Sequence, residues 1–358
     1  MYPKIYKRWS ASGEALIIPE RYHPYLGLRD TETAIKLIKD NFQLRLAENL
    51  NLSRVSAPIS VLKKTGLNDN LSGTEKPVGF TVSSINEDAE IVQSLAKWKR
   101  NALADYDFNH GEGLYTDMNA IRPDEEILDN LHSVYVDQWD WERIISKEER
   151  SVEFLKEIVK RIYRAVKETE AAVFSEYPDV AFLELPEEIR FIHSEELLER
   201  YPGLTPKERE DAVCEEYGAV FIIGIGADLS DGHPHDLRAA DYDDWSTFTQ
   251  NGRQGLNGDI LVWYPLLGCS FELSSMGIRV DKEALLRQLE LKNEINKKDK
   301  YFHKRLLDGE LPLTVGGGIG QSRLCMLYLK KTFIGEVQSS VWSDDLRQIC
   351  SENNIPVL

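Results

Sequence analysis

Residues 113–141 read GLYTDMNAIRPDEEILDNLHSVYVDQWDW and predict two neighbouring strands. Side chains alternate with a period of two over 113–121 and 133–141, and both stretches are rich in aromatic and β-branched residues. A polar loop over 122–132 joins the two strands. The alternation places Trp139 and Trp141 on one face of the second strand, where we expect them to belong to the core.

The segments on either side of this pair predict further strands and helices. Along the chain, these strands and helices do not follow one another in strict alternation. We expect strands over 52–59, where Pro58 favours an edge or an interface, over 78–92 as strand, turn and strand, and over 219–226, 261–264 and 271–275. We expect a helix that begins at about Thr31, with Asp30 or Thr31 as its cap, and two helices that begin with capping boxes. The first box is Ser146–Glu149, and the second is Thr205–Glu208, whose helix ends at Gly218. Further helices are expected over 94–103 and 281–291, and a last one begins at about Gly320. This order predicts an α+β fold, an antiparallel sheet flanked by helices, rather than a parallel doubly wound sheet.

Length and composition indicate a single large domain. The chain has 358 residues, which is long enough for a sizeable core. Repeats, low-complexity segments and Pro/Ser-rich linkers are not evident, so we expect one catalytic domain over 29–358. Residues 1–28 contain three prolines and scattered aromatic residues, which suggests an N-terminal extension that packs on the body.

The net charge and the spacing of the cysteines limit which binding partners and which cellular compartment are expected. With 60 acidic and 43 basic residues the formal net charge is -17, so most of the surface should repel nucleic acid. The four cysteines, Cys214, Cys269, Cys325 and Cys350, are spaced too widely for a zinc knuckle or a disulfide framework and are expected to be free thiols. A signal-peptide pattern is absent, and the longest apolar stretch, 219–227, is about half the length that a spanning helix needs. We therefore expect a cytoplasmic protein with no nucleic-acid or membrane partner.

Residues 316–323, GGGIGQSR, form the first candidate site. Glycines let the backbone approach a ligand, and a helix N-terminus favours anions. The stretch lacks the Lys-Ser/Thr of a P-loop and is not followed by a βαβ unit. Arg323, one turn into the helix, favours nucleotide binding, and a plain glycine-rich turn between a strand and a helix is the alternative.

Arginine and carboxylate side chains form the second group of candidates. Arg122 stands at a strand end, where a guanidinium can hold a phosphate, although such an arginine taken alone is more often a surface ion-pair partner. Polar residues in apolar or glycine-rich surroundings are Asp69, Asp137, Gln138, Asp140, Asp243, Asp259 and Glu272. Structural ion pairs explain any one of them, whereas a cluster is typical of a site for Mg²⁺ and phosphates. His233 and His235 fit a polar loop better than a zinc site.

The order of these elements resembles the three motifs of class II aminoacyl-tRNA synthetases. The resemblance is closer to their relatives, the ammonia-dependent asparagine synthetases or aspartate–ammonia ligases. It rests on DNLSGxEK at 69–76, SLAKWKR at 94–100, GEGLYT at 111–116, RPDE at 122–125, HSVYVDQWDWER at 132–143, LSDGH at 229–233, DYDDWS at 241–246, LNGDILVW at 256–263, ELSSMGIR at 272–279 and the glycine motif. These stretches cover roughly residues 30–345, and the first 28 residues have no counterpart in the resemblance.

The resemblance implies a two-step ligase reaction. The β-carboxylate of L-aspartate attacks the α-phosphate of ATP, giving β-aspartyl-AMP and pyrophosphate, and ammonia then displaces AMP to give L-asparagine. It also implies Mg²⁺ as a cofactor and a homodimer with its interface at 31–58. Because a carboxylate and a triphosphate repel each other, cations must stand between them.

The resemblance also assigns roles to individual residues. Arg122 would hold the α-phosphate and the reacting carboxylate, with Lys99 and Gln138 as further catalytic residues. The residues implied for aspartate are Asp69, Ser94, Ser133, Asp140, Asp243, Ser275 and Arg279, with Asp69 and Asp243 on its ammonium group. Those implied for ATP are Arg122, Glu125, Arg238, Glu272, Gly318, Gly320 and Arg323, with Glu125 near the adenine. The metal would be held by Asp259 and Glu272.

Two other classes compete with the ligase. A tRNA synthetase should carry an anticodon domain and a basic face, and the net charge of -17 and the length argue against both. A regulatory module without activity should have lost the motif arginines, yet Arg122 and Arg323 are both present.

Overall fold

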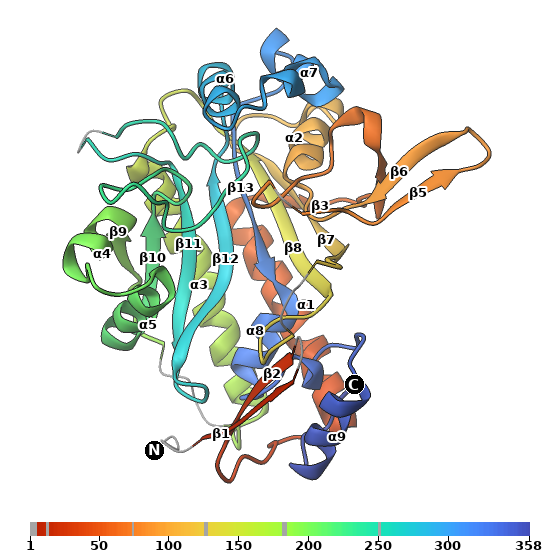
Figure 1. Ribbon diagram of the computed structural model, residues 1–358, viewed down its shortest axis with the longest axis vertical. Helices are drawn as coiled ribbons and strands as arrows, with labels where there is room; N and C mark the ends of the chain where they lie inside the picture. Colours follow the sequence, from red (N-terminus) through yellow and green to blue (C-terminus); the bar gives the residue numbers. More distant parts are fainter. Residues whose placement is uncertain (1–5, 12–13, 74, 125–127, 181–184, 250–251) are drawn as a thin grey trace.

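The computed structural model describes residues 6–11, 14–73, 75–124, 128–180, 185–249 and 252–358. The central element in this part of the chain is an eight-stranded sheet, ordered β3 (Leu52–Arg54), β7 (Gly113–Ile121), β8 (Tyr135–Ile144), β13 (Thr314–Gly320), β12 (Cys269–Ile278), β11 (Asn257–Tyr264), β10 (Ala219–Ile223) and β9 (Arg190–His193). The inner strands pair antiparallel, and β3 and β9 add in parallel at the two edges (Figure 1). The predicted α+β fold is confirmed.

The main core lies on the face of the sheet that carries the two tryptophans. Trp139 and Trp141 are fully buried there, among side chains of α1 (Leu28–Leu50), α3 (Val152–Glu176) and α8 (Gln321–Tyr328). The ring centroids of Phe42 on α1 and Trp139 lie 4.7 Å apart. Since side chains alternate along a strand, Gln138 and Asp140 project from the opposite face.

Other elements cover that opposite face only in part. α4 (Ser194–Arg200) and α5 (Pro206–Tyr217) pack over β9–β11 through a separate apolar cluster. α2 (Ala96–Asp105), α6 (Lys282–Leu291) and α7 (Tyr301–Asp308) lie at the end of the sheet that is uppermost in Figure 1. The middle strands β8, β13 and β12 are thereby left accessible between these two groups.

Smaller elements complete the described structure. β4 (Ser60–Leu62), β6 (Glu87–Ile91) and β5 (Gly79–Val82) form a three-stranded sheet, from which the β5–β6 hairpin projects (Figure 1). β1 (Tyr6–Ala11) and β2 (Glu14–Pro19) form a hairpin at the other end of the molecule, near α9 (Asp344–Glu352). Three short 3-10 helices are η1 (Lys63–Thr65), η2 (Ile295–Asp299) and η3 (Ile334–Glu336).

Three helix predictions are wrong. α1 begins at Leu28 after Gly27 and not at Thr31, whose hydroxyl instead bonds back to Leu26 O. Glu149 accepts a hydrogen bond from the Ser146 backbone as the box predicts, but this closes a turn, and Ser151 caps α3 by accepting from Phe154 N. The helix after Gly320 is not the last, because α9 follows it.

The second capping box behaves as predicted. Thr205 accepts from Glu208 N, Glu208 bonds back to the Thr205 backbone, and α5 ends at Gly218. Three residues, 55–57, separate the end of β3 from Pro58, so the proline follows an edge strand, as expected. None of the helices among the described residues is long and apolar enough to cross a membrane.

Candidate active site

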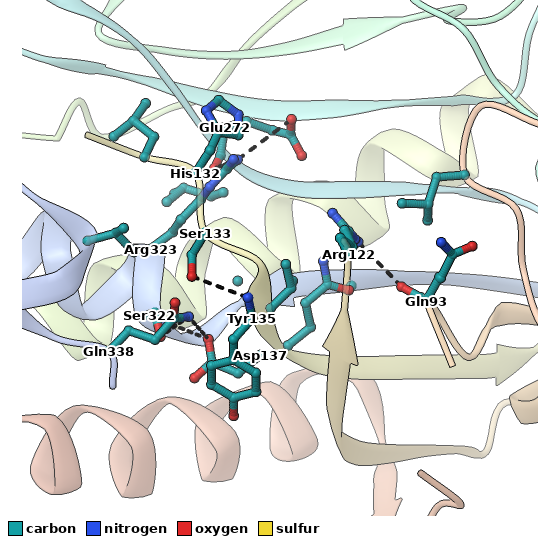
Figure 2. A pocket seen from close by; sticks show the side chains of 18 of the residues that line it. Gln93, Arg122, His132, Ser133, Tyr135, Asp137, Glu272, Ser322, Arg323 and Gln338 are labelled. Atoms are coloured by element: carbon teal, nitrogen blue, oxygen red, sulfur yellow. Dashed lines mark hydrogen bonds and ion pairs between the residues drawn. The ribbon is translucent and has the colours of Figure 1, made fainter. Parts of the chain in front are cut away.

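Two adjoining cavities open over β8, β13 and β12, on the face opposite the tryptophans. The larger has a volume of about 380 Å³ and the smaller about 310 Å³. The side chains or backbone that line both are those of Leu71, Glu75, Arg122, Gln138, Glu272 and Gly318. Because they share this wall, the two cavities form one site with two compartments (Figure 2 shows the larger one).

Strand register places four predicted site residues in one row across the sheet. Asp140 faces Gly318, and Gly318 in turn faces Ser275. Ser275 then faces Asp259 on β11. A Cβ atom at Gly318 would lie 2.3 Å from Gln138 Oε1 and 2.7 Å from Asp140 Oδ1, so only glycine keeps the middle of the row open.

Arg122 occupies the junction of the two compartments. It follows β7 directly, and its backbone N–H still pairs with Val134 O at 2.8 Å, so the strand pair fixes its position. Its side chain is half-buried, and Nη2 donates to Gln93 O at 3.4 Å (Figure 2). A guanidinium here can contact groups in both compartments, as the sequence prediction requires.

The larger compartment contains the second motif arginine. Arg323 Nη1 donates to Glu272 O at 3.1 Å and lies 3.8 Å from Glu272 Oε2. Gly320 ends β13 and precedes the first turn of α8, which also supplies Ser322 to the cavity wall. Ser133 lines the same wall (Figure 2). The larger compartment therefore brings together residues predicted for ATP. It also contains Ser133, for which the resemblance implies a contact with aspartate.

The smaller compartment is lined by cations that are held by buried carboxylates. Arg279 donates from Nε to Glu142 Oε1 at 3.0 Å and from Nη1 to Asp243, and Arg238 Nη2 donates to Asp259 Oδ2 at 2.6 Å. Burial alone would lower the pKa of Arg279, but Glu142 and Asp243 raise it above its usual range. The arginine therefore stays charged inside the protein.

Lys99 on α2 lies at the base of this compartment. Its side chain is 1% exposed, and Nζ donates to the carbonyl oxygens of Trp141 and Gly317, each at 3.0 Å. Nζ is also 3.3 Å from Asp140 Oδ2, which accepts a hydrogen bond from Leu95 N at 3.1 Å. This network ties the start of α2 to β8 and β13 below the cavity.

Asp259 and Glu272 form the predicted metal pair. Asp259 Oδ1 is buried and has no hydrogen-bond partner among the described residues, while Oδ2 binds Arg238. Burial raises the pKa of Asp259 despite Arg238, and the charge of Glu272 adds to the rise. Two neighbouring carboxylates, one with an unpaired oxygen, suit Mg²⁺, which takes few protein ligands and completes its shell with phosphate and water oxygens. A group of three or more His, Cys, Asp or Glu ligands is not found among the described residues, so the pair fits a phosphate-bound Mg²⁺ rather than a closed metal site.

Not every predicted residue reaches the cavity wall. Asp69 lies beneath the first turn of α2, where Oδ2 accepts from Ala96 N at 2.6 Å and Oδ1 lies 3.8 Å from Lys97 Nζ. Burial raises the pKa of Asp69 to about 6, although Lys97 opposes the rise. Asp69, Asp140 and Asp259 lie behind the wall, whereas Ser94, Asp243 and Ser275 are part of it. Glu125 lies outside the described residues.

Some residues of the site were missed by the sequence prediction. Glu142 is fully buried, accepts from Arg279 and Thr314, and lies 3.9 Å from Lys99. Burial would raise the pKa of Glu142, but Arg279 and Lys99 hold it below the usual value. The sequence could have pointed to Glu142, because it stands two residues after Asp140 and therefore on the same face of the strand. Other wall residues to which the sequence prediction gave no role are Glu75, Gln93, His132, Tyr242 and Gln338. Glu75, His132 and Tyr242 belong to stretches that carry the resemblance, whereas Gln93 and Gln338 carry no local sequence signal.

The fold resembles solved synthetase structures. Asparaginyl-tRNA synthetase of Pyrococcus horikoshii, in complex with asparaginyl-adenylate, matches with a TM-score of 0.66 at 17% identity, over 89% of this chain and 72% of that chain. The enzyme of Entamoeba histolytica with asparaginyl-adenylate gives a TM-score of 0.63 at 14% identity, over 87% of this chain and 66% of that chain. At these identities the likeness establishes the class II synthetase-like fold alone.

Sequence relatives are much closer. Aspartate–ammonia ligase of Parabacteroides distasonis is 60% identical over 93% of this chain and 96% of its own length. Those of Bacteroides thetaiotaomicron and Clostridium perfringens are each 58% identical over 96% of this chain, and over 99% and 100% of their own lengths. The family model described as aspartate-ammonia ligase matches residues 29–354. The chain belongs to the aspartate–ammonia ligase family.

Proposed function

We propose that this protein joins L-aspartate and ammonia into L-asparagine, with ATP converted to AMP and pyrophosphate. The observation that carries the proposal is the position of Arg122 in the wall common to both compartments. ATP would occupy the larger compartment, beside Arg323, and aspartate the smaller one, beside Arg279 and Lys99. Arg122 then stands where the two anionic substrates must meet.

In the first step an oxygen of the aspartate β-carboxylate attacks the α-phosphorus and pyrophosphate leaves. Arg122 reduces the repulsion between the anions and stabilises the charge that develops as they approach. Arg238, whose charge is maintained by Asp259, and Arg323 hold the remaining phosphate oxygens. Lys99 and Gln138 orient the carboxylate from the base of the site.

In the second step the nitrogen of ammonia attacks the carbonyl carbon (Cγ) of the activated side-chain carboxyl group of β-aspartyl-AMP. The bond between that carbon and the phosphate-linked oxygen breaks, and AMP leaves with this oxygen. The amide nitrogen releases one proton. Gln138 lies at the wall shared by both compartments, so its amide can contact the reacting carbonyl group in both steps.

Mg²⁺ would be held by Asp259 and Glu272 and would supply positive charge to the phosphates. Asp259→Asn and Glu272→Gln should each raise the Mg²⁺ concentration for half-maximal rate by about tenfold or more, because a ligand oxygen loses its charge. Magnesium titrations of the asparagine-forming rate measure this. Glu157→Gln on the exposed surface of α3 is the matched control. Wild-type magnesium dependence in both site variants would make the pair purely structural.

Asp243 would select aspartate by pairing with its α-ammonium group. Asp243→Ala should raise the aspartate KM about tenfold or more, since a buried charge-assisted pair is lost. The ATP KM should change much less. Asp69→Ala should raise the aspartate KM as well and should also lower the melting temperature, because Ala96 N loses its acceptor. An equal rise in both KM values, or no rise, would contradict the selection role.

Free ammonia is the proposed nitrogen source. The relatives at 58–60% identity are named aspartate–ammonia ligase, which supports ammonia as the nitrogen donor. AMP formation should require aspartate, ammonium and ATP together, without tRNA. Activity with glutamine in ammonia-free buffer would contradict the choice of ammonia. A requirement for tRNA would instead favour a synthetase.

We also propose a homodimer that meets through the segment 31–58. Leu44 on α1 is 59% exposed and Ile59, next to this segment, is 64% exposed, so both offer apolar surface to a second copy.

The proposed compartment is the cytoplasm, where ATP is available and the free thiols stay reduced.

A further inference from the structure

The N-terminal hairpin packs into the body of the enzyme although it lies outside the residues that the family model matches. On β2, Leu16 is 1% exposed and Ile18 is 4% exposed, and both belong to the main core. Ala15 N on β2 donates to Leu128 O at 3.0 Å, and Thr332 Oγ1, after α8, donates to Ile17 O at 3.3 Å. The hairpin and α8 lie in the same lower part of Figure 1. Its contacts there connect it to the nucleotide compartment.

The first contact is made through one buried side chain. Asn130, 5% exposed, accepts from Ile17 N at 2.8 Å and donates to Ile17 O at 2.8 Å, as a neighbouring strand would. The same amide nitrogen donates to Thr332 O at 2.6 Å, and Asn130 O accepts from Ile334 N at 2.8 Å. Asn130 therefore joins three segments: the hairpin, the loop before β8 and the chain after α8.

The second contact comes from the turn that follows β2. Tyr22 Oη lies 3.0 Å and 2.9 Å from the two carboxylate oxygens of Glu336, which is fully buried. Glu336 accepts in turn from Thr332 N at 3.0 Å and from Phe333 N at 3.2 Å. Tyr22 thus holds the carboxylate that shapes the turn 332–336.

The two segments held in this way form one wall of the larger compartment. Leu131, His132 and Ser133 line it from the loop before β8, and Ile334 and Gln338 line it from the chain after α8. His132, Ser133 and Gln338 are seen together on this wall in Figure 2.

Hydrogen bonds also join the wall segments to each other and to α8. Ser133 Oγ donates to Ser340 Oγ at 2.7 Å, and Gln338 Nε2 donates to Ser322 Oγ at 3.0 Å. A shift of the wall would therefore reach the first turn of α8, which carries Arg323.

We propose that Asn130 and Tyr22 are positioning residues for ATP: Asn130 joins the N-terminal hairpin to the wall of the nucleotide compartment, and Tyr22 holds the turn 332–336 of that wall. Neither residue lines the cavities, so each acts through the wall residues next to it. The inference rests on the proposed function, because it takes the larger compartment as the ATP compartment. Aspartate, in the other compartment, should be little affected.

The test compares Asn130→Ala and Tyr22→Phe with Tyr25→Phe, a tyrosine of the same segment that is 46% exposed. Asn130→Ala removes three hydrogen bonds that hold the wall and Tyr22→Phe removes one hydroxyl, so the ATP KM should rise about tenfold for Asn130→Ala and about threefold for Tyr22→Phe. The aspartate KM and kcat should stay within about twofold, and Tyr25→Phe should match the wild type. Should Asn130→Ala fail to fold, Tyr22→Phe carries the test.

Calorimetric titration with ATP in the absence of aspartate gives an independent readout, and the dissociation constant should rise by the same factors. Variants that lose only melting temperature, or in which both KM values rise equally, would overturn the positioning role. A wild-type enzyme that binds ATP but forms no asparagine would overturn the proposed function instead. The calorimetric comparison would still decide the role of the hairpin.

Discussion

Replacing Arg122 by lysine should slow the aspartate-dependent exchange of pyrophosphate into ATP about 100-fold or more, by analogy with the loss of one oxyanion-hole donor. Lysine keeps the charge but loses the planar fork that can hold a carboxylate oxygen and an α-phosphate oxygen together. This double contact is strongest when the two anions meet, so the loss appears in the rate of the step. ATP affinity should change less, because Arg323 and Arg238 remain.

The exchange is measured without ammonia, which isolates the first step. Arg200→Lys is the matched control, because that side chain pairs with Glu216 on the surface and lines neither compartment. Circular dichroism and size-exclusion chromatography check that the variants fold. Wild-type exchange by Arg122→Lys would show that Arg122 does not bridge the substrates.

Arg279→Met should lower the free energy of unfolding by about 3–5 kcal/mol, because it leaves buried carboxylates without their cation. Among the described residues, Glu142 would keep Lys99, 3.9 Å away, and Thr314 as partners, while Asp243 would lose its guanidinium partner. Burial already raises the pKa of Asp243 although Arg279 and Arg238 oppose the rise, so the loss of Arg279 leaves the buried carboxylate less stabilised. Urea unfolding followed by circular dichroism measures the change.

Two further variants separate this charge effect from a general loss of packing. Arg200→Met breaks a surface pair with Glu216 and should cost about 1 kcal/mol or less. Adding Glu142→Gln to Arg279→Met should recover part of the loss, since one of the stranded charges is removed. A cost for Arg279→Met no greater than that for Arg200→Met would contradict the buried ion-pair account.

Much of the fold follows from local sequence patterns. β7 has the bounds predicted from its period of two, and the Thr205 box starts α5. The helix errors arise where local signals compete. Ser151, rather than the box at 146–149, caps α3. α1 begins without a side-chain cap, because burial of its apolar face determines where the helix starts.

The site could be predicted only in part. The glycine motif and Arg122 carry local signals, and the structure places both on the shared walls. The row from Asp140 to Asp259 depends on the register of four strands, and β8 and β11 lie more than a hundred residues apart in the chain. Register across such separations is set by tertiary pairing, which periodicity alone does not contain. The same holds for Asp69, whose position beneath α2 depends on contacts made after folding.

The central claim is that a carboxylate oxygen of aspartate attacks the α-phosphate of ATP. The most direct test supplies L-aspartate labelled with ¹⁸O in both β-carboxylate oxygens, together with ATP, Mg²⁺ and ammonium, and measures the masses of the products. The account predicts AMP with one ¹⁸O, asparagine with the other and unlabelled pyrophosphate. Unlabelled AMP, or ADP and labelled phosphate in its place, would contradict it.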